Sequence, residues 1–162
     1  MHSLAFLFAL SLAAPPAAAP APSVDANAAF ERLKKLEGSW KTDAKDGPVQ
    51  YVALRLIAAG TAVLETNTAA DRTTVTSVTV YSFEGSRLIA THYGSGGTSK
   101  LELSGADAAA LKFDGSSRDA RVGGLWLVVK QNKLREEWTM RESGRDVKKA
   151  IELLSEYVDT LK

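Results

Sequence analysis

Nine short segments rich in β-branched and aromatic residues follow one another along this chain, and only a few residues separate each from the next. Parallel neighbouring strands need connections of about a dozen residues or more, whereas antiparallel neighbours are joined by tight turns. We therefore predict antiparallel strands that pair in sequence order. They span residues 36–43, 49–57, 61–67, 73–84, 87–93, 98–104, 108–113, 122–130 and 133–141.

The number of strands favours a sheet that closes into a barrel. An open meander leaves two unpaired edge strands, and closing the sheet on itself removes both. The predicted fold is all-β, an antiparallel up-and-down barrel of about nine to ten strands with a short N-terminal helix. Asp25 can cap that helix, Phe30, Leu33 and Leu36 recur on one of its faces, and Gly38 is its predicted stop.

The segment 147–162 is open between two structures. Val147, Ile151 and Leu154 recur at helical spacing, while Ile151, Leu153 and Tyr157 alternate as in a strand. Residues 142–146, ESGRD, suit a hairpin turn and equally a helix start capped by Ser143 or Asp146. Composition favours a helix, and barrel closure favours a strand.

The N-terminus predicts export. Residues 4–14 form an apolar run of eleven residues, a Pro/Ala-rich stretch follows, and the first charged side chain is Asp25. This is the pattern of a secretory signal peptide, and the run is too short to span a bilayer as a helix. We predict a leader over residues 1–26, cleaved after Ala26, and one barrel domain over residues 27–162, periplasmic or secreted. A flexible tail or a buried helix is the alternative.

Charge and cysteine content exclude several functions. The 20 basic and 19 acidic side chains leave a net charge of +1, which offers no basic face for nucleic acid. No cysteine is present, which excludes disulfides, thiolate nucleophiles and lipid attachment at an N-terminal cysteine. The expected partner is a small molecule, with no nucleic acid and no stable membrane insertion once the leader is removed.

The sequence Gly38-Ser39-Trp40, at the head of the first strand, resembles the G-x-W signature of lipocalins and the wider calycin group. The stretches LKKLEGSW, GTAVLET, VYSFEGSRLIATHY and LREEWT resemble an uncharacterised bacterial family of exported calycin-like barrel proteins. The resemblance implies that Trp40 closes one barrel end and that the last segment is a closing strand up to about Tyr157. In the family pattern Thr-His-Tyr is followed by cysteine and then Asn-Gln-Pro. Here Gly94 stands in place of the cysteine, so no activity of that thiol carries over.

His92 is the first candidate site residue, since a neutral imidazole can bind a ligand, ligate a metal or act as a general base. Strand alternation puts His92 on one face with Leu88 and Ala90 and puts Tyr93 on the other. We predict His92 inside the barrel. The calycin resemblance adds an axial haem contact at His92 as an alternative, and no cofactor or metal site is otherwise expected.

Glu65 is the second candidate, because it lies in an otherwise apolar strand and shares a face with Val63. Glu136 and Trp138 share one face of their strand, and Glu137 lies on the other. A solvated outer face of the barrel is the alternative for most of these side chains, Glu65 included. The predicted ligand-binding residues are His92, Glu65, Tyr81 and Trp138. If the protein is an enzyme, His92 is the base and Glu65 the acid, with Tyr81 or Tyr93 as donor. Residues 94–97 are predicted as a hairpin turn, and Trp40, Trp126 and Trp138 as core or barrel-end packing.

Three functions remain open from the sequence. The first is an exported barrel that binds a small, mostly apolar ligand in its lumen. The second is an enzyme of the isomerase or cyclase type that uses His92 and Glu65. The third is a filled barrel with a structural or stress role. A filled barrel predicts a lumen packed with side chains and an apolar patch outside.

Overall fold

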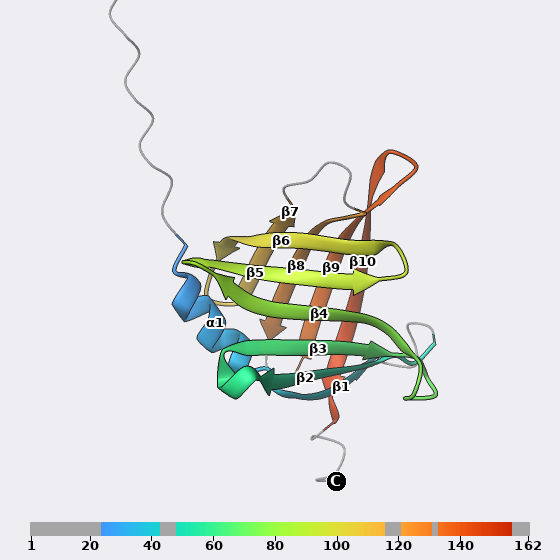
Figure 1. Ribbon diagram of the computed structural model, residues 1–162. Coiled ribbons are helices and arrows are strands. Elements are labelled where there is room, and N and C mark those ends of the chain that lie inside the picture. Colours follow the sequence, from blue (N-terminus) through green and yellow to red (C-terminus); the bar gives the residue numbers. More distant parts are fainter. Residues whose placement is uncertain (1–23, 43–47, 116–120, 131–132, 157–162) are drawn as a thin grey trace, which may run out of the picture.

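The computed structural model describes residues 24–42, 48–115, 121–130 and 133–156, and these form a closed antiparallel barrel (Figure 1). Each strand pairs with the next in the chain, as predicted. The strands are β1 (Gly38–Thr42), β2 (Tyr51–Ile57), β3 (Ala62–Thr68), β4 (Val75–Glu84), β5 (Arg87–Gly94), β6 (Gly97–Ala106), β7 (Ala110–Gly115), β8 (Val122–Lys130), β9 (Lys133–Glu142) and β10 (Arg145–Ser155). The predicted leader up to residue 23 lies outside the described residues, as does Tyr157, and the domain boundary after Ala26 stays a prediction.

The last strand closes the barrel. β10 pairs with β9 on one side and with β1 on the other, where Leu153 stands opposite Thr42. Residues 145–155 are therefore a strand rather than a helix, because pairing with β9 along most of their length and with β1 at residues 153–155 closes the sheet. The turn between β9 and β10 has positive φ at Ser143 (51°) and Gly144 (78°), which is typical of a type I′ hairpin.

The predicted N-terminal helix is present as α1 (Ala26–Lys34). The Asp25 carboxylate caps it by accepting a hydrogen bond from the Ala28 N–H at 3.0 Å. The helix ends at Lys34, and Gly38, its predicted stop, instead begins β1.

The inner face of α1 closes one end of the barrel, the end at the left of Figure 1. Phe30 and Leu33 are buried, and the Phe30 ring packs edge-on against Phe83 at the end of β4. The indole N–H of Trp40 donates to the Leu36 carbonyl oxygen at 3.1 Å. Trp40 thus packs at the closed end, as the resemblance implies.

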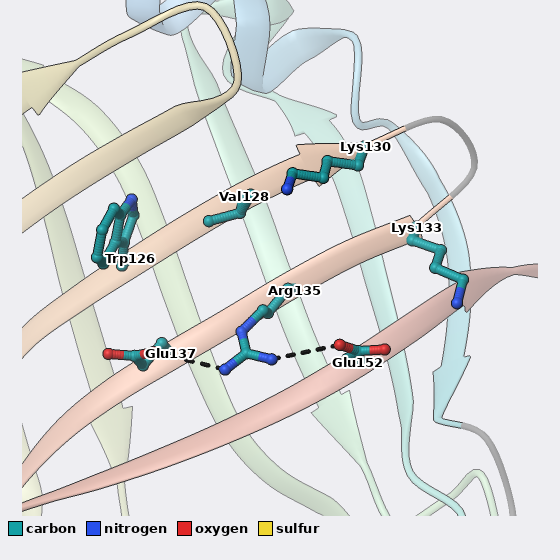
Figure 2. Close-up of a pocket in the computed structure, with 7 residues that line it drawn as sticks. All are labelled: Trp126, Val128, Lys130, Lys133, Arg135, Glu137 and Glu152. Atoms are coloured by element: carbon teal, nitrogen blue, oxygen red, sulfur yellow. Dashed lines mark hydrogen bonds and ion pairs between the residues drawn. The ribbon is translucent and has the colours of Figure 1, made fainter.

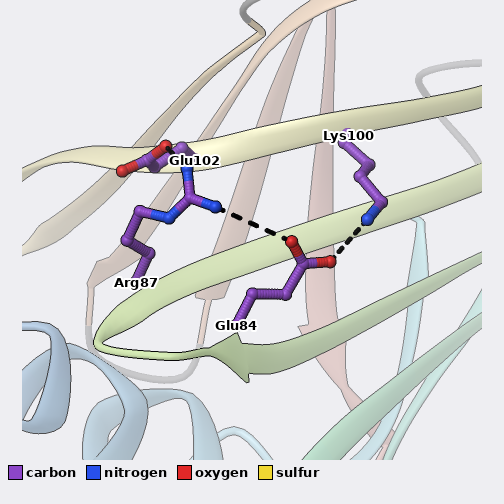
Figure 3. Close-up of polar contacts among 4 residues, drawn as sticks. All are labelled: Glu84, Arg87, Lys100 and Glu102. Atoms are coloured by element: carbon purple, nitrogen blue, oxygen red, sulfur yellow. Dashed lines mark hydrogen bonds and ion pairs between the residues drawn. The ribbon is translucent and has the colours of Figure 1, made fainter.

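Large side chains fill the middle of the barrel. Those less than 2% exposed include Leu54, Tyr81, Leu88, Leu101, Phe113, Leu125, Leu127, Leu134 and Leu153. The outer face is polar. Figure 3 shows one example, where Glu84 of β4 pairs with Lys100 of β6 and Arg87 of β5 pairs with Glu102. In the part of the chain described, no helix is long and apolar enough to cross a membrane.

Candidate functional site

A row of polar side chains crosses four neighbouring strands inside the barrel. In the strand register, Glu65 of β3 stands opposite Thr79 of β4, Thr79 opposite His92 of β5, and His92 opposite Ser99 of β6. Directly paired residues point to the same face of a sheet, so these four side chains all face inward. Glu65 and Thr79 are fully buried, Ser99 is buried and His92 is half-buried.

Glu65 is the most heavily hydrogen-bonded side chain of the row. Its Oε2 accepts from the Tyr81 hydroxyl at 2.6 Å, and its Oε1 accepts from the Asn67 amide at 3.0 Å and from the Thr79 hydroxyl at 3.4 Å. Burial raises the pKa of Glu65 above its usual value, and the three donors offset only part of this effect. Such donors stabilise the carboxylate form inside a medium that otherwise disfavours it.

Glu136 of β9 is a second fully buried carboxyl group close enough to Glu65 for their charges to interact. Its Oε2 accepts one hydrogen bond, from the indole N–H of Trp138 at 3.2 Å, and its Oε1 has no partner among the described residues. Burial, and then the charge of Glu65, hold the pKa of Glu136 well above its usual range. Glu65 has three donors and Glu136 has one, so the proton of the pair resides on Glu136.

His92 connects this network to the surface. Its Nδ1 lies 3.1 Å from the Thr79 hydroxyl, and its ring packs against Trp138 with ring centroids 4.8 Å apart. Burial lowers the pKa of His92, so the imidazole is neutral near neutral pH. Nε2 lies next to Gly94, where an added Cβ would come within 2.9 Å of it. The absence of a side chain at Gly94 therefore leaves Nε2 accessible.

A pocket of about 210 Å³ opens over His92 at the end of the barrel opposite to α1, and we call it the mouth pocket. It lies between the β5–β6 turn, the start of β8 and the β9–β10 hairpin, on the right in Figure 1. It is lined by Thr76, Ser77, His92, Ser99, Arg121, Val122, Met140, Glu142, Lys149 and the turn residues 94–97. Most of these are polar or charged.

A larger hollow of about 470 Å³ lies on the outer face of β8, β9 and β10 (Figure 2). Trp126 is 41% exposed there, which contradicts its predicted packing in the core or at a barrel end. The reason is strand alternation: Leu125 and Leu127 take the inner face of β8, and Trp126 takes the outer one. Arg135 forms ion pairs with Glu137 at 3.6 Å and Glu152 at 3.3 Å across this surface. All three ion-pairing side chains are partly exposed, and the hollow is therefore a solvated outer surface.

The structure brings together the four residues that the sequence singles out. Tyr81 contacts Glu65, Glu65 and His92 share Thr79 as a hydrogen-bond partner, and His92 packs on Trp138. Tyr93 is 48% exposed on the opposite side of β5, so it takes no part in this cluster. The predicted split of His92 and Tyr93 between two faces is thus confirmed.

Sequence reasoning considered Glu136 but did not choose it as a site residue, and it missed Thr79 and Asn67. A signal for Glu136 was present, because it alternates with the inward-facing Leu134 and Trp138. Asn67 shares the buried face of β3 with Glu65, two residues earlier, so alternation offered a signal for it as well. Thr79 gave no signal of its own, because a threonine in a strand joins such a site only through the register that sets it beside a buried carboxylate.

Within the ranges the structure describes, no three or more histidine, aspartate and glutamate side chains are grouped to hold a metal ion. No known protein-family model matches the chain, and no curated protein matches it in sequence. The resemblance to exported calycin-like barrels is consistent with the closed ten-strand barrel. Beyond that architecture, it stays a prediction.

Proposed function

We propose that this protein binds a small molecule in the mouth pocket, with His92 at the floor of the site. The observation that carries the proposal is the position of the His92 ring: Nδ1 is held by Thr79, while Nε2 lies beside Gly94 at the pocket. A hydrogen-bonded polar network inside a barrel core is costly to desolvate. A ligand that binds Nε2 of His92, the ring nitrogen beside the pocket, gives this network a role.

The pocket size and lining narrow the ligand. About 210 Å³ is below the range of about 300–1,000 Å³ that drug-sized ligands occupy, so the ligand is much smaller than haem. The polar and charged lining favours a ligand with a polar group. Val122 and Met140 supply an apolar wall, and any apolar part of the ligand would pack there.

Substitution of a single glycine tests the proposal. In Gly94→Ala the new methyl group displaces Nε2 of His92, and we expect ligand binding to fall at least tenfold. Gly105→Ala is the matched control, because its added Cβ meets only Lys112 Cβ at 3.6 Å, an ordinary contact. The readouts are native mass spectrometry of the protein purified from its own host and amide shifts on addition of host extract. If no compound binds, or if Gly94→Ala binds as well as the control, the proposal is wrong.

An enzyme of the isomerase or cyclase type is the second candidate, and the Glu65–Thr79–His92 chain favours it. A base held through Thr79 by a buried carboxylate, with protonated Glu136 nearby, has the groups needed for proton transfer. Binding the ligand in deuterated water separates the two functions. An enzyme exchanges a ligand C–H for deuterium or converts the ligand, whereas a binding protein returns it unchanged.

The filled barrel is the third candidate. The packed middle of the barrel is compatible with a structural role, and this candidate predicts that no small molecule binds at the mouth pocket.

Export is proposed on the N-terminal sequence alone. N-terminal sequencing of the protein recovered from the periplasm would test both export and the cleavage site, and recovery of the full chain from the cytoplasm would contradict them.

A further inference from the structure

We infer that the ligand of the mouth pocket is a small carboxylate that also carries an O–H group, which it donates to Nε2 of His92 while Arg121 and Lys149 hold its carboxylate. This inference rests on the proposed function and specifies the ligand class. Three observations lead to it: the tautomer of His92, the open side of its ring and the charge of the pocket rim.

The tautomer follows from counting hydrogens. The Thr79 hydroxyl carries a single hydrogen and stands between Glu65 Oε1 and His92 Nδ1. Glu65 accepts from every other polar neighbour it has, so the Thr79 hydrogen goes to Glu65. Thr79 can then only accept from His92, which requires the hydrogen of the neutral ring on Nδ1. Nε2 is left with a lone pair, and its partner must be a donor.

The lone pair of Nε2 is available to the pocket. No described residue donates to Nε2, and beside it on the same strand lies Gly94, which has no side chain. Ring packing against Trp138 on one side and the Thr79 contact on the other fix the orientation of the imidazole. The ring is therefore preorganised to accept a hydrogen bond from a ligand, which lowers the entropy lost on binding.

The rim of the pocket favours an anion. Arg121 and Lys149 are positive and Glu142 is negative, so a neutral His92 leaves one positive charge in excess. Glu142 pairs with Lys149 at 2.6 Å. The Arg121 side chain lies across Gly96, so close that any side chain at that position would collide with it. Arg121 is exposed and lines the pocket, and its planar guanidinium suits a carboxylate.

The volume limits the ligand to a small acid. About 210 Å³ is below the range of about 300–1,000 Å³ that drug-sized ligands occupy. A short hydroxy acid such as lactate is of this size. It offers one carboxylate for the rim and one hydroxyl for His92.

Nitrogen NMR of the imidazole tests the tautomer without any ligand. In the full-length protein we expect the hydrogen of His92 on Nδ1. Thr79→Val, which keeps the shape and removes the hydroxyl, should yield a mixture of tautomers, and Thr79→Ser should restore the Nδ1–H form. A purely structural role for Thr79 would leave the tautomer unchanged. A wild-type ring that carries its hydrogen on Nε2 would overturn the inference.

Three matched compounds test the ligand class. Lactate has both groups, propanoate lacks the hydroxyl and lactamide lacks the charge. We expect lactate to bind about tenfold more tightly than either analogue, the effect of one hydrogen bond or ionic contact. His92→Phe should abolish the preference for lactate over propanoate, and Arg121→Gln the preference for lactate over lactamide.

The outcomes separate this inference from the proposed function. If propanoate or lactamide binds as tightly as lactate, the ligand class is wrong. It is also wrong if none of the three binds while another compound from host extract shifts the amides of residues 94–97, and in that case the proposed function stands. If no compound shifts them, both fail.

Discussion

Two buried carboxyl groups inside this barrel accept unequal numbers of hydrogen bonds. Glu65 has three donors, whereas Glu136 has one donor and an Oε1 without a partner in the described structure. Two carboxylates that interact in a low-dielectric core cannot both ionise cheaply. The pair therefore holds a proton, and Glu136 is the site where it resides.

Glu136→Gln should stabilise the protein at alkaline pH. A buried carboxyl group with a raised pKa keeps its proton in the folded state, while the unfolded chain loses it above the ordinary value of 4.5. Stability therefore falls as the pH rises from 4.5 towards the folded-state pKa. The amide removes this loss, so we expect a gain of about 1–2 kcal/mol at pH 8 and little change at pH 4. Urea unfolding at both pH values measures it.

Glu137→Gln is the matched control, since Glu137 is the neighbour of Glu136 on the outer face. Lys148 and Arg135 lower the pKa of Glu137, which is the opposite direction. We expect no gain at pH 8 from this substitution, and a loss of at most about 1 kcal/mol. Equal gains from both variants would contradict the assignment of the proton to Glu136.

Tyr81→Phe should destabilise the barrel by about 1–3 kcal/mol, because it removes a buried donor to Glu65 and leaves Oε2 unpaired. Tyr93→Phe removes the same atom from an exposed ring and should change stability by less than about 0.5 kcal/mol. Thermal unfolding of the two variants provides the comparison. A neutral Tyr81→Phe would show that its hydroxyl does not stabilise Glu65.

Strand pairing brings residues that are distant in the sequence next to one another. Antiparallel pairing in sequence order sets Glu65, Thr79, His92 and Ser99 side by side, although each is 7 to 14 positions from the next member of the row in the chain. A register shift of one residue in any of these strands would turn its polar side chain outward.

Helix α1 depends on a cap just before it, and that cap, Asp25, lies within the predicted leader 1–26.

Asp25→Ala should lower stability by about 1 kcal/mol, because the Ala28 N–H loses its acceptor. Asn27→Ala is the control: Asn27 is exposed in the first turn of α1, and alanine favours helix, so no loss is expected. Cleavage after Ala26 would remove the same cap. A mature protein beginning at Asn27 should therefore unfold at a lower temperature than one beginning at Val24, and equal midpoints would argue against the cap.

The whole barrel is closed at one end and open at the other. Phe30 and Leu33 of α1, with Trp40, fill the closed end, and the mouth pocket lies at the opposite end. The closed end contributes apolar burial, and the open end carries the polar groups available to a ligand. The proposed ligand site thus lies at the end of the barrel opposite to the apolar packing of α1.

Leu33→Ala should cost about 2–5 kcal/mol, because Leu33 is fully buried between α1 and the barrel and its loss leaves a cavity. Leu56→Ala makes the same chemical change at a side chain that is 38% exposed, and we expect a loss of less than about 1 kcal/mol. Because the two ends are separate, Leu33→Ala should leave ligand affinity unchanged in the folded protein. A large loss of affinity without unfolding would contradict that separation.

The sequence by itself determined the strand order, the antiparallel pairing and the short helix, and it placed His92 and Tyr93 on opposite faces of one strand. Short connections leave few topologies, and alternation assigns faces once a strand is recognised. Only the tertiary structure decided that residues 145–155 are a strand, because their periodicity fits two structures and pairing with β1 and β9 selects one. It also decided which polar residues form the site. Thr79 meets Glu65 and His92 through strand register, and Glu65 interacts with Glu136 of a non-adjacent strand because the barrel closes, which no local pattern encodes.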